Sequence, residues 1–162
     1  MRRDPGFTLV EMMVVIAILG TMTATAMQLY HTYRYRTYGT EAAVMLKQLL
    51  NSETIYFLGN DKFFPEVGQT ITAFHDDPPS KAEIAQTRDA LKITIPVGHL
   101  LDYTITTTPE PVCMVTISSY KNSFALFKGD VRSITGSVDG SGNTEIFYGE
   151  QPPQTGGGCT PR

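Results

Sequence analysis

Residues 7–30 form a predominantly apolar stretch with a single charged side chain, Glu11. As a helix, these 24 residues would extend about 36 Å, enough to cross a hydrocarbon core of roughly 30 Å. A secretory signal peptide has a shorter apolar region, about 7–15 residues, followed by its cleavage site. Here the candidate cleavage signal precedes the apolar stretch, so a membrane-spanning helix is predicted. An ordinary signal anchor is the alternative, and it leaves Glu11 unexplained.

The helical pattern continues beyond the apolar stretch. Apolar residues recur at steps of three and four through residues 42–57, with polar residues on the other side. No proline lies between Pro5 and Pro65 to break the helix. We therefore expect one helix over about residues 7–58, roughly 78 Å long, ended by the Gly-Asn-Asp sequence of residues 59–61. Its amphipathic second half is expected to pack on a sheet.

After Leu91 the pattern changes to a period of two, which is typical of strands. Residues 65–90 mix proline, glycine, aspartate and threonine, and predict a long connection with a helical turn within residues 80–90. The Asp-Gly-Ser-Gly-Asn sequence of residues 139–143 predicts a hairpin turn. Strands that follow a long helix indicate the α+β class, with an antiparallel sheet. The expected strands are residues 92–97, 102–106, 112–118, 123–127, 132–138 and 144–148.

The composition favours neither catalysis nor general nucleic-acid binding. The 162 residues carry a net charge of −3 with a pI near 5.5, so the chain as a whole offers no basic surface to a polyanion. Its three histidines lie far apart, and no phosphate-binding loop or nucleophile motif is present. We therefore expect no enzyme activity, and assign no catalytic residue and no cofactor.

Two segments could hold a metal ion, but each has a simpler explanation. His75-Asp76-Asp77 could be a weak ion site, although a solvated loop explains it better. The oxygen-bearing side chains alternate through residues 139–145, as at the start of a calcium loop, but the glutamate at position twelve is missing. A hairpin turn explains these residues as well, so no metal site is assigned.

The sequence Gly6-Phe7-Thr8-Leu9-Val10-Glu11 resembles the processing signature of the type IV pilin family, which includes the pseudopilins of type II secretion systems. The resemblance implies that a membrane aspartyl peptidase, the prepilin peptidase, cuts after Gly6 and methylates the new amino terminus at Phe7. It also implies that Glu11 pairs with the amino terminus of a neighbouring subunit during filament assembly.

The position of Glu11 is physically consistent with that role. A carboxylate within a membrane helix costs roughly 2.5–3.5 kcal/mol on insertion scales, so such a group usually faces a partner. After cleavage, the Phe7 amine would lie four residues from Glu11 in the same helix, close enough to offset part of that cost. Between subunits the same pair would set the axial register, because a misaligned subunit leaves a charge unpaired. The alternative is a glutamate that snorkels to the membrane interface.

The apolar helix departs from the family pattern at one position. Gly20 and Ala24 form a small-xxx-small pair that permits close helix approach, although random occurrence explains it nearly as well. In the family a helix-breaking proline usually follows eight residues after a glycine at the Gly20 position, whereas this chain has Gln28. The departure leans mildly toward a minor or specialised subunit, whereas the head resembles that of a small major pilin. Three threonines, Thr21, Thr23 and Thr25, could still permit local loosening.

Aromatic and basic residues follow the apolar stretch. Four tyrosines alternate with His31, Arg34 and Arg36, which is typical of an interfacial belt. Packing between neighbouring helices of a filament is the alternative. Because arginines flank the stretch on both sides, the family resemblance decides the orientation, with the leader in the cytoplasm and the head outside. The tyrosines are Tyr30, Tyr33, Tyr35 and Tyr38.

The chain has two cysteines, Cys113 and Cys159. Outside the cytosol they would most simply form one disulfide that ties the glycine-rich C-terminal tail to a strand. The loop-entropy contribution of such a bridge is about 4 kcal/mol. Pilins often carry a bridge near the C-terminus, so the resemblance also favours it. Two free buried thiols are the alternative.

The expected plan has four parts: a leader (1–6), a transmembrane or filament-core helix (7–30), an amphipathic helix half (31–60) and a globular head (61–162). The resemblance implies a structural subunit of a type IV pilus, made in the inner membrane with its head in the periplasm and then assembled into an extracellular filament. Its expected partners are other copies of itself or other pilins, the prepilin peptidase, the inner-membrane assembly platform and, before assembly, membrane lipid. The alternatives are a secretion pseudopilin and a minor or tip pilin that binds DNA or a surface.

Overall fold

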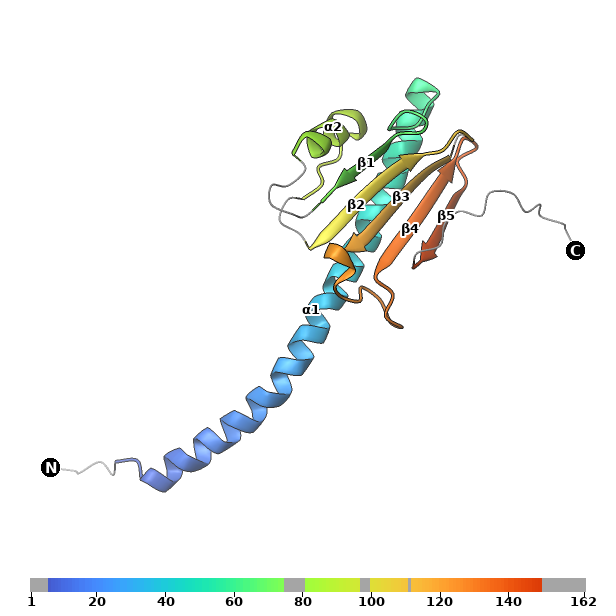
Figure 1. Ribbon diagram of the computed structural model, residues 1–162. Helices are drawn as coiled ribbons and strands as arrows, with labels where there is room; N and C mark the ends of the chain where they lie inside the picture. The colour runs from blue at the N-terminus through green and yellow to red at the C-terminus, as the bar shows by residue number, and fades with distance from the viewer. Residues whose placement is uncertain (1–5, 75–80, 97–99, 111, 150–162) are drawn as a thin grey trace, which may run out of the picture. The chain divides into compact units, whose positions relative to one another are not determined.

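The computed structural model describes residues 6–74, 81–96, 100–110 and 112–149. A long helix is followed by a head with a five-stranded antiparallel sheet, so the predicted α+β class is confirmed. In chain order the elements are α1 (Leu9–Asn60), β1 (Thr70–Ala73), α2 (Lys81–Leu91), β2 (Leu101–Thr107), β3 (Val112–Ser119), the 3-10 helix η1 (Tyr120–Asn122), β4 (Ser133–Asp139) and β5 (Thr144–Tyr148) (Figure 1).

The chain divides into two compact units, Met1–Tyr35 and Arg36–Arg162. The first contains the N-terminal part of α1, and the second contains the rest of α1 with all the other elements. The helix ends at Asn60, as the sequence predicts. Asp61 then adopts a left-handed backbone with φ of 55°, and its N–H donates to the carbonyl of Phe57 at 2.8 Å. This is the αL type of helix C-cap.

The sheet has the order β1-β2-β3-β4-β5, and every adjacent pair is antiparallel. Its register places Tyr103 opposite Ile117, and Ile117 opposite Ile134. These three side chains are at most 1% exposed, and they alternate with polar residues that point the other way. One face of the sheet is therefore apolar and the other is rich in hydroxyl groups.

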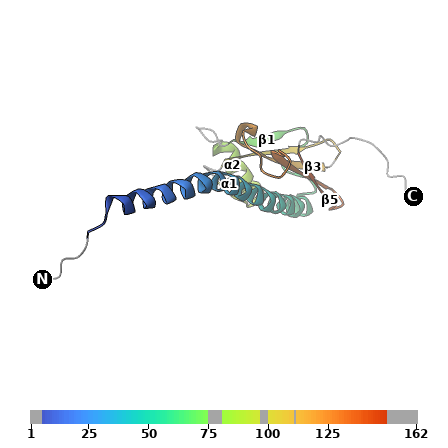
Figure 2. The same cartoon turned by 90° about the horizontal axis from the view of Figure 1, so that it is seen from below.

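The part of α1 that belongs to the second unit lies along the apolar face of the sheet (Figures 1 and 2). Leu46, Leu49 and Leu50 are at most 2% exposed and form the centre of the core. Gly136 of β4 allows this close approach, because a Cβ there would lie 2.5 Å from Leu50 Cδ1. At Gly39 a Cβ would overlap the backbone carbonyl of Leu126. Glycines thus fix where the helix meets the rest of the head.

Several predicted elements are confirmed almost to the residue. Strands β2, β3, β4 and β5 match their predictions within one residue at each end. The helical turn expected within residues 80–90 is the complete helix α2. It packs beside the edge strand β1 (Figure 1).

Two predicted strands are wrong. Residues 92–96 form no strand, because Lys92 ends α2 with a φ of 58° and Pro96 has no N–H to donate; Val97 lies outside the described residues. Ile95 is nevertheless only 2% exposed, so its side chain packs in the core although its backbone is not part of a strand. Residues 123–127 contribute only an isolated bridge between Phe127 and Val131.

One strand was missed. Strand β1 lies in the segment predicted to be a connection, and it pairs with β2 from Thr70 opposite Thr106 to Ala73 opposite Tyr103. With four residues, it is too short for its alternation to stand out among the neighbouring glycine, proline and aspartate.

Candidate functional site

At the N-terminus of α1, Thr8 and Glu11 are joined by three hydrogen bonds. The backbone N–H and the hydroxyl of Thr8 both donate to Glu11 Oε2, at 2.9 and 2.8 Å. In return, the N–H of Glu11 donates to Thr8 Oγ1 at 3.3 Å. This is a capping box, which satisfies two of the free N–H groups at the start of a helix. The signal for it, threonine followed three residues later by glutamate, is present in the sequence, but Thr8 was not identified as a site residue.

Only one oxygen of Glu11 takes part in this pair. Both bonds from Thr8 reach Oε2, and no described residue donates to Oε1. The side chains of Phe7 and Leu9 on either side of Thr8 are 82% and 76% exposed. The capping box therefore positions the carboxylate while leaving one of its oxygens accessible.

The apolar part of α1 is exposed on all sides. Every residue from 6 to 37 is exposed, including the large side chains of Val10, Ile16 and Leu19. In the described part of the chain, α1 is the one helix long and apolar enough to cross a membrane. A helix that is apolar all round needs lipid or other helices around it.

The threonines of the apolar stretch make local hydrogen bonds within the helix. The hydroxyls of Thr21, Thr23 and Thr25 donate to the carbonyls of Ile18, Leu19 and Met22 at 2.9, 2.7 and 2.9 Å. Hydroxyls bonded in this way are satisfied without water, as an apolar environment requires. The helix runs without a break through Gly20 and Gln28, so the single subunit does not show the local loosening that these threonines could permit.

The four tyrosines fall into two groups. Tyr30, Tyr33 and Tyr35 are 64%, 74% and 36% exposed, as an interfacial belt requires. Tyr38 instead packs within the head, where its ring centroid lies 5.7 Å from that of Phe124. Tyr38 therefore helps to anchor α1 to the head.

A second polar cluster lies inside the head, around the backbone of Phe64. The N–H of Phe64 donates to Glu53 Oε2 at 3.1 Å, and the Cys113 thiol donates to the carbonyl of Phe64 at 3.7 Å. Both Glu53 and Cys113 are 0% exposed. Burial raises the pKa of Glu53 to about 8, although the Phe64 N–H works against this shift. Burial likewise raises the pKa of Cys113 well above its ordinary value.

Within the described residues Cys113 is a buried cysteine that forms no disulfide, while Cys159 lies outside them. The pairing of the two cysteines therefore stays a prediction. Glu53 was not identified from the sequence as a buried acid. It lies among amphipathic helix residues whose pattern places most polar side chains on the outside.

The structure describes only one of the two segments considered for metal binding. His75-Asp76-Asp77 lies outside the described residues. At the β4–β5 hairpin, Asp139 Oδ1 accepts bonds from the backbone N–H groups of Ser141 and Asn143, at 3.0 and 2.9 Å. Hydrogen bonds from Ser141 and Asn143 lower the pKa of Asp139, so this carboxylate acts as the organiser of the turn. Among the described residues, no group of three acidic, histidine or cysteine side chains could hold a metal ion.

Comparison with known proteins finds a family match at the N-terminus. The family model for the prokaryotic N-terminal methylation motif matches residues 1–27. The type IV major pilin protein PilE1 of Neisseria gonorrhoeae is 38% identical over 58 residues, which cover 36% of this chain and 35% of that protein. The type IV major pilin protein PilA of Myxococcus xanthus (strain DK1622) is 34% identical over 61 residues, which cover 38% of this chain and 28% of that protein.

A fimbrial protein of Neisseria meningitidis serogroup B is 36% identical over 58 residues, which cover 36% of this chain and 34% of that protein. The chain thus matches these curated relatives over only about a third of their length. No solved structure matches the chain.

Proposed function

We propose that this chain, which belongs to the type IV pilin family, is a structural subunit that polymerises through its N-terminal helix into a type IV pilus. The prepilin peptidase removes the leader after Gly6 and methylates the new amino terminus at Phe7. The match of residues 1–27 to the methylation motif supports this step. A structural role, and not a catalytic one, is characteristic of the family.

The observation that carries the proposal is the accessible Oε1 of Glu11 at the start of an exposed apolar helix. The capping box holds the carboxylate in place, and Oε1 can then accept a hydrogen bond from the Phe7 amine of a neighbouring subunit. In an apolar filament core, an unpaired charge costs several kcal/mol. Each incoming subunit is therefore stable only in the register that pairs its Phe7 amine with a Glu11 carboxylate.

Before assembly, lipid covers the exposed apolar helix in the inner membrane, with the head in the periplasm. On the assembly platform, the helices of neighbouring subunits replace lipid, and the subunit leaves the membrane for the extracellular filament. When neighbouring helices replace lipid, the apolar side chains of the helix stay in apolar surroundings. The pairing of charges can therefore decide the register without a large change in apolar burial. The similarity to major pilins supports a pilin subunit, and a secretion pseudopilin is the alternative.

Replacement of Glu11 by valine in the native cell tests the proposal. Glu11→Val removes the charge from the apolar stretch, so membrane insertion becomes easier. It leaves the Gly6–Phe7 junction intact, so processing continues. We expect abundant mature protein in the membrane and almost no filaments by electron microscopy. A normal filament yield would contradict the proposal.

A matched variant separates charge pairing from helix capping. Thr8→Val removes the hydroxyl of the capping box but keeps the Glu11 carboxylate, at a cost of about 1 kcal/mol to the helix start. We expect reduced but detectable filament formation from Thr8→Val. If both variants abolished filaments equally, Glu11 would act through helix capping and not through a partner subunit.

A further inference from the structure

The segment that follows α1 covers Cys113 of strand β3. The Cys113 side chain lies on the apolar face of the sheet and is 0% exposed, and its thiol donates to the carbonyl of Phe64 at 3.7 Å. Residues 63–65 are all buried, although the residues on either side of them, Lys62 and Glu66, are exposed. We call residues 63–65 the strap, because they cross the core between two exposed positions.

The strap is attached to α1 by one hydrogen bond and by aromatic stacking. The N–H of Phe64 donates to Glu53 Oε2 at 3.1 Å. The ring of Phe63 stacks on that of Phe57, with 4.5 Å between the ring centroids and 25° between the planes. Together with the bond from the Cys113 thiol, these contacts join the strap to both α1 and β3.

The other side of the strap lines a cavity at the surface of the head. All three strap residues line this cavity of about 350 Å³, together with side chains that include Tyr56 and Gln86. Phe64 therefore both lines the cavity and accepts the hydrogen bond from the Cys113 thiol. A displacement of the strap would connect Cys113 to the cavity and so to solvent.

Two features make displacement of the strap less costly than unfolding of the head. Residues 61–69 belong to no helix or strand, so the strap can move without breaking a ladder of backbone hydrogen bonds. Buried polar atoms also lie beneath it: Glu53 Oε1 and Thr107 Oγ1 receive no hydrogen bond from the described residues, and Thr107 lies opposite Cys113 in the sheet. Water that enters on opening would supply these atoms with partners, which offsets part of the lost apolar burial.

We propose that the strap controls access to Cys113, by opening locally while the rest of the head stays folded. With the strap closed, no reagent reaches the sulfur; with the strap open, the thiol can react. A bridge to Cys159 would take one proton from each thiol and pass two electrons to a disulfide-bearing oxidant, a reaction that requires contact with the sulfur. Such a bridge can therefore form only before the strap closes or while it is open.

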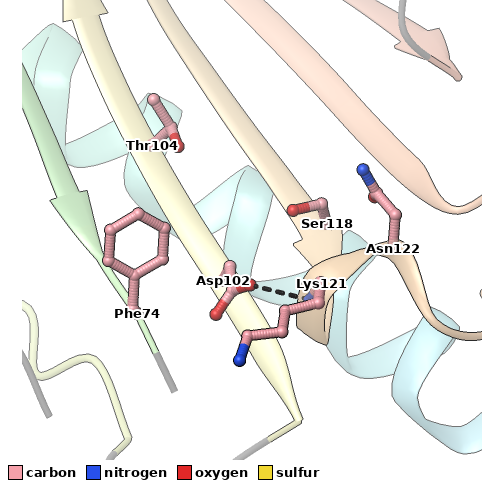
Figure 3. A pocket seen from close by; sticks show the side chains of 6 residues that line it. All are labelled: Phe74, Asp102, Thr104, Ser118, Lys121 and Asn122. Carbon is pink, nitrogen blue, oxygen red and sulfur yellow. Dashed lines mark hydrogen bonds between the residues drawn. The ribbon is translucent and has the colours of Figure 1, made fainter. Parts of the chain in front are cut away.

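A second cavity of the head offers no comparable route to the thiol. Figure 3 shows this cavity, of about 290 Å³, on the polar face of the sheet, where Thr104 and Ser118 line it. The turn beside it is held by the N–H of Lys121, which donates to Asp102 Oδ2 at 3.2 Å. Its lining includes neither a strap residue nor Cys113, which lies on the opposite face of the sheet. Access to Cys113 therefore depends on the strap.

Alkylation of the reduced full chain in detergent micelles tests the proposal. The probe is N-ethylmaleimide, and peptide mapping by mass spectrometry gives the rate at Cys113 over a series of urea concentrations. Below the unfolding transition we expect a rate that hardly changes with urea and is about tenfold or more above the rate that global unfolding allows, because local opening exposes little surface. A rate that follows global unfolding at every urea concentration would overturn the proposal. So would a rate without urea equal to that of the unfolded chain, since Cys113 would then not be covered.

Two variants assign the opening to the strap. Phe63→Ala removes the stacking on Phe57 and should raise the alkylation rate of Cys113 without urea by about tenfold or more. The matched control is Leu126→Ala, which truncates another buried side chain, beside Gly39 and away from the strap, and should change this rate by less than about twofold. If Phe63→Ala does not fold, the milder Phe63→Leu gives the same comparison. Acceleration in both variants in proportion to their loss of global stability would overturn the proposal.

Discussion

The backbone N–H of Phe64 donates to Glu53 Oε2 at 3.1 Å, so the segment that follows α1 is tied to a carboxyl group inside the core. Oε1 of the same carboxyl group is buried, and no hydrogen bond reaches it from any of the described residues. Such a group is most stable when protonated, and burial accordingly raises the pKa of Glu53 to about 8. The acid thus couples the attachment of this segment to pH.

We predict that the stability of the head falls as pH rises between about 4.5 and 8. In this window the folded state keeps the proton on Glu53, whose pKa is raised from 4.5 to about 8, while the unfolded state loses it. The free energy of unfolding should therefore decrease by about 1.4 kcal/mol per pH unit from this group. Urea denaturation of the wild-type chain at a series of pH values measures the slope.

Glu53→Gln should flatten this slope, because glutamine keeps an oxygen acceptor for the Phe64 N–H but does not titrate. The control is Glu110→Gln, which changes an exposed glutamate and should leave the slope as in the wild type. A slope that is equally steep in Glu53→Gln would show that another group is responsible.

The backbone of α1 at Gly39 lies close to the backbone of Leu126. We predict that Gly39→Ala destabilises the head by about 1–3 kcal/mol, because the new Cβ would overlap the Leu126 carbonyl. The matched control is Gly59→Ala in the same helix, where a Cβ meets no atom within 4 Å. That variant should stabilise the protein by up to about 1 kcal/mol, since alanine has the higher helix propensity. Thermal unfolding of both variants measures the change in stability. Equal changes in the two variants would show that the contact at Gly39 is unimportant.

We predict a disulfide between Cys113 and Cys159 in the exported protein. Under denaturing conditions without reductant, a thiol-alkylating reagent should add to neither cysteine, and after reduction it should add to both. Loss of the bridge should lower stability by about 4 kcal/mol in the loop-entropy estimate. Alkylation of both cysteines before reduction would instead establish that the two thiols are free.

The parts of the fold that could be predicted depend on local signals. The end of α1 follows from the Gly-Asn-Asp sequence, and the β4–β5 hairpin follows from turn residues that Asp139 organises by its own hydrogen bonds. The roles of Gly6, Phe7 and Glu11 stay predictions, and the signal for them is the spacing of these residues relative to the apolar stretch.

The remaining features depend on contacts between distant segments. Ile95 and Leu126 have strand-like sequence neighbours, but their side chains fill the core without pairing. Glu53 became a buried acid because the segment around Phe64 covers it, which helix periodicity alone does not reveal.

The most direct test of the central claim is the intact mass of this chain in filaments sheared from the cell surface. The account predicts a subunit that begins at Phe7 and carries one methyl group at its amino terminus. The residues from Met1 to Gly6 should be absent from it. Filaments that contain the chain with Met1 retained, or surface filaments that lack the chain entirely, would contradict the account.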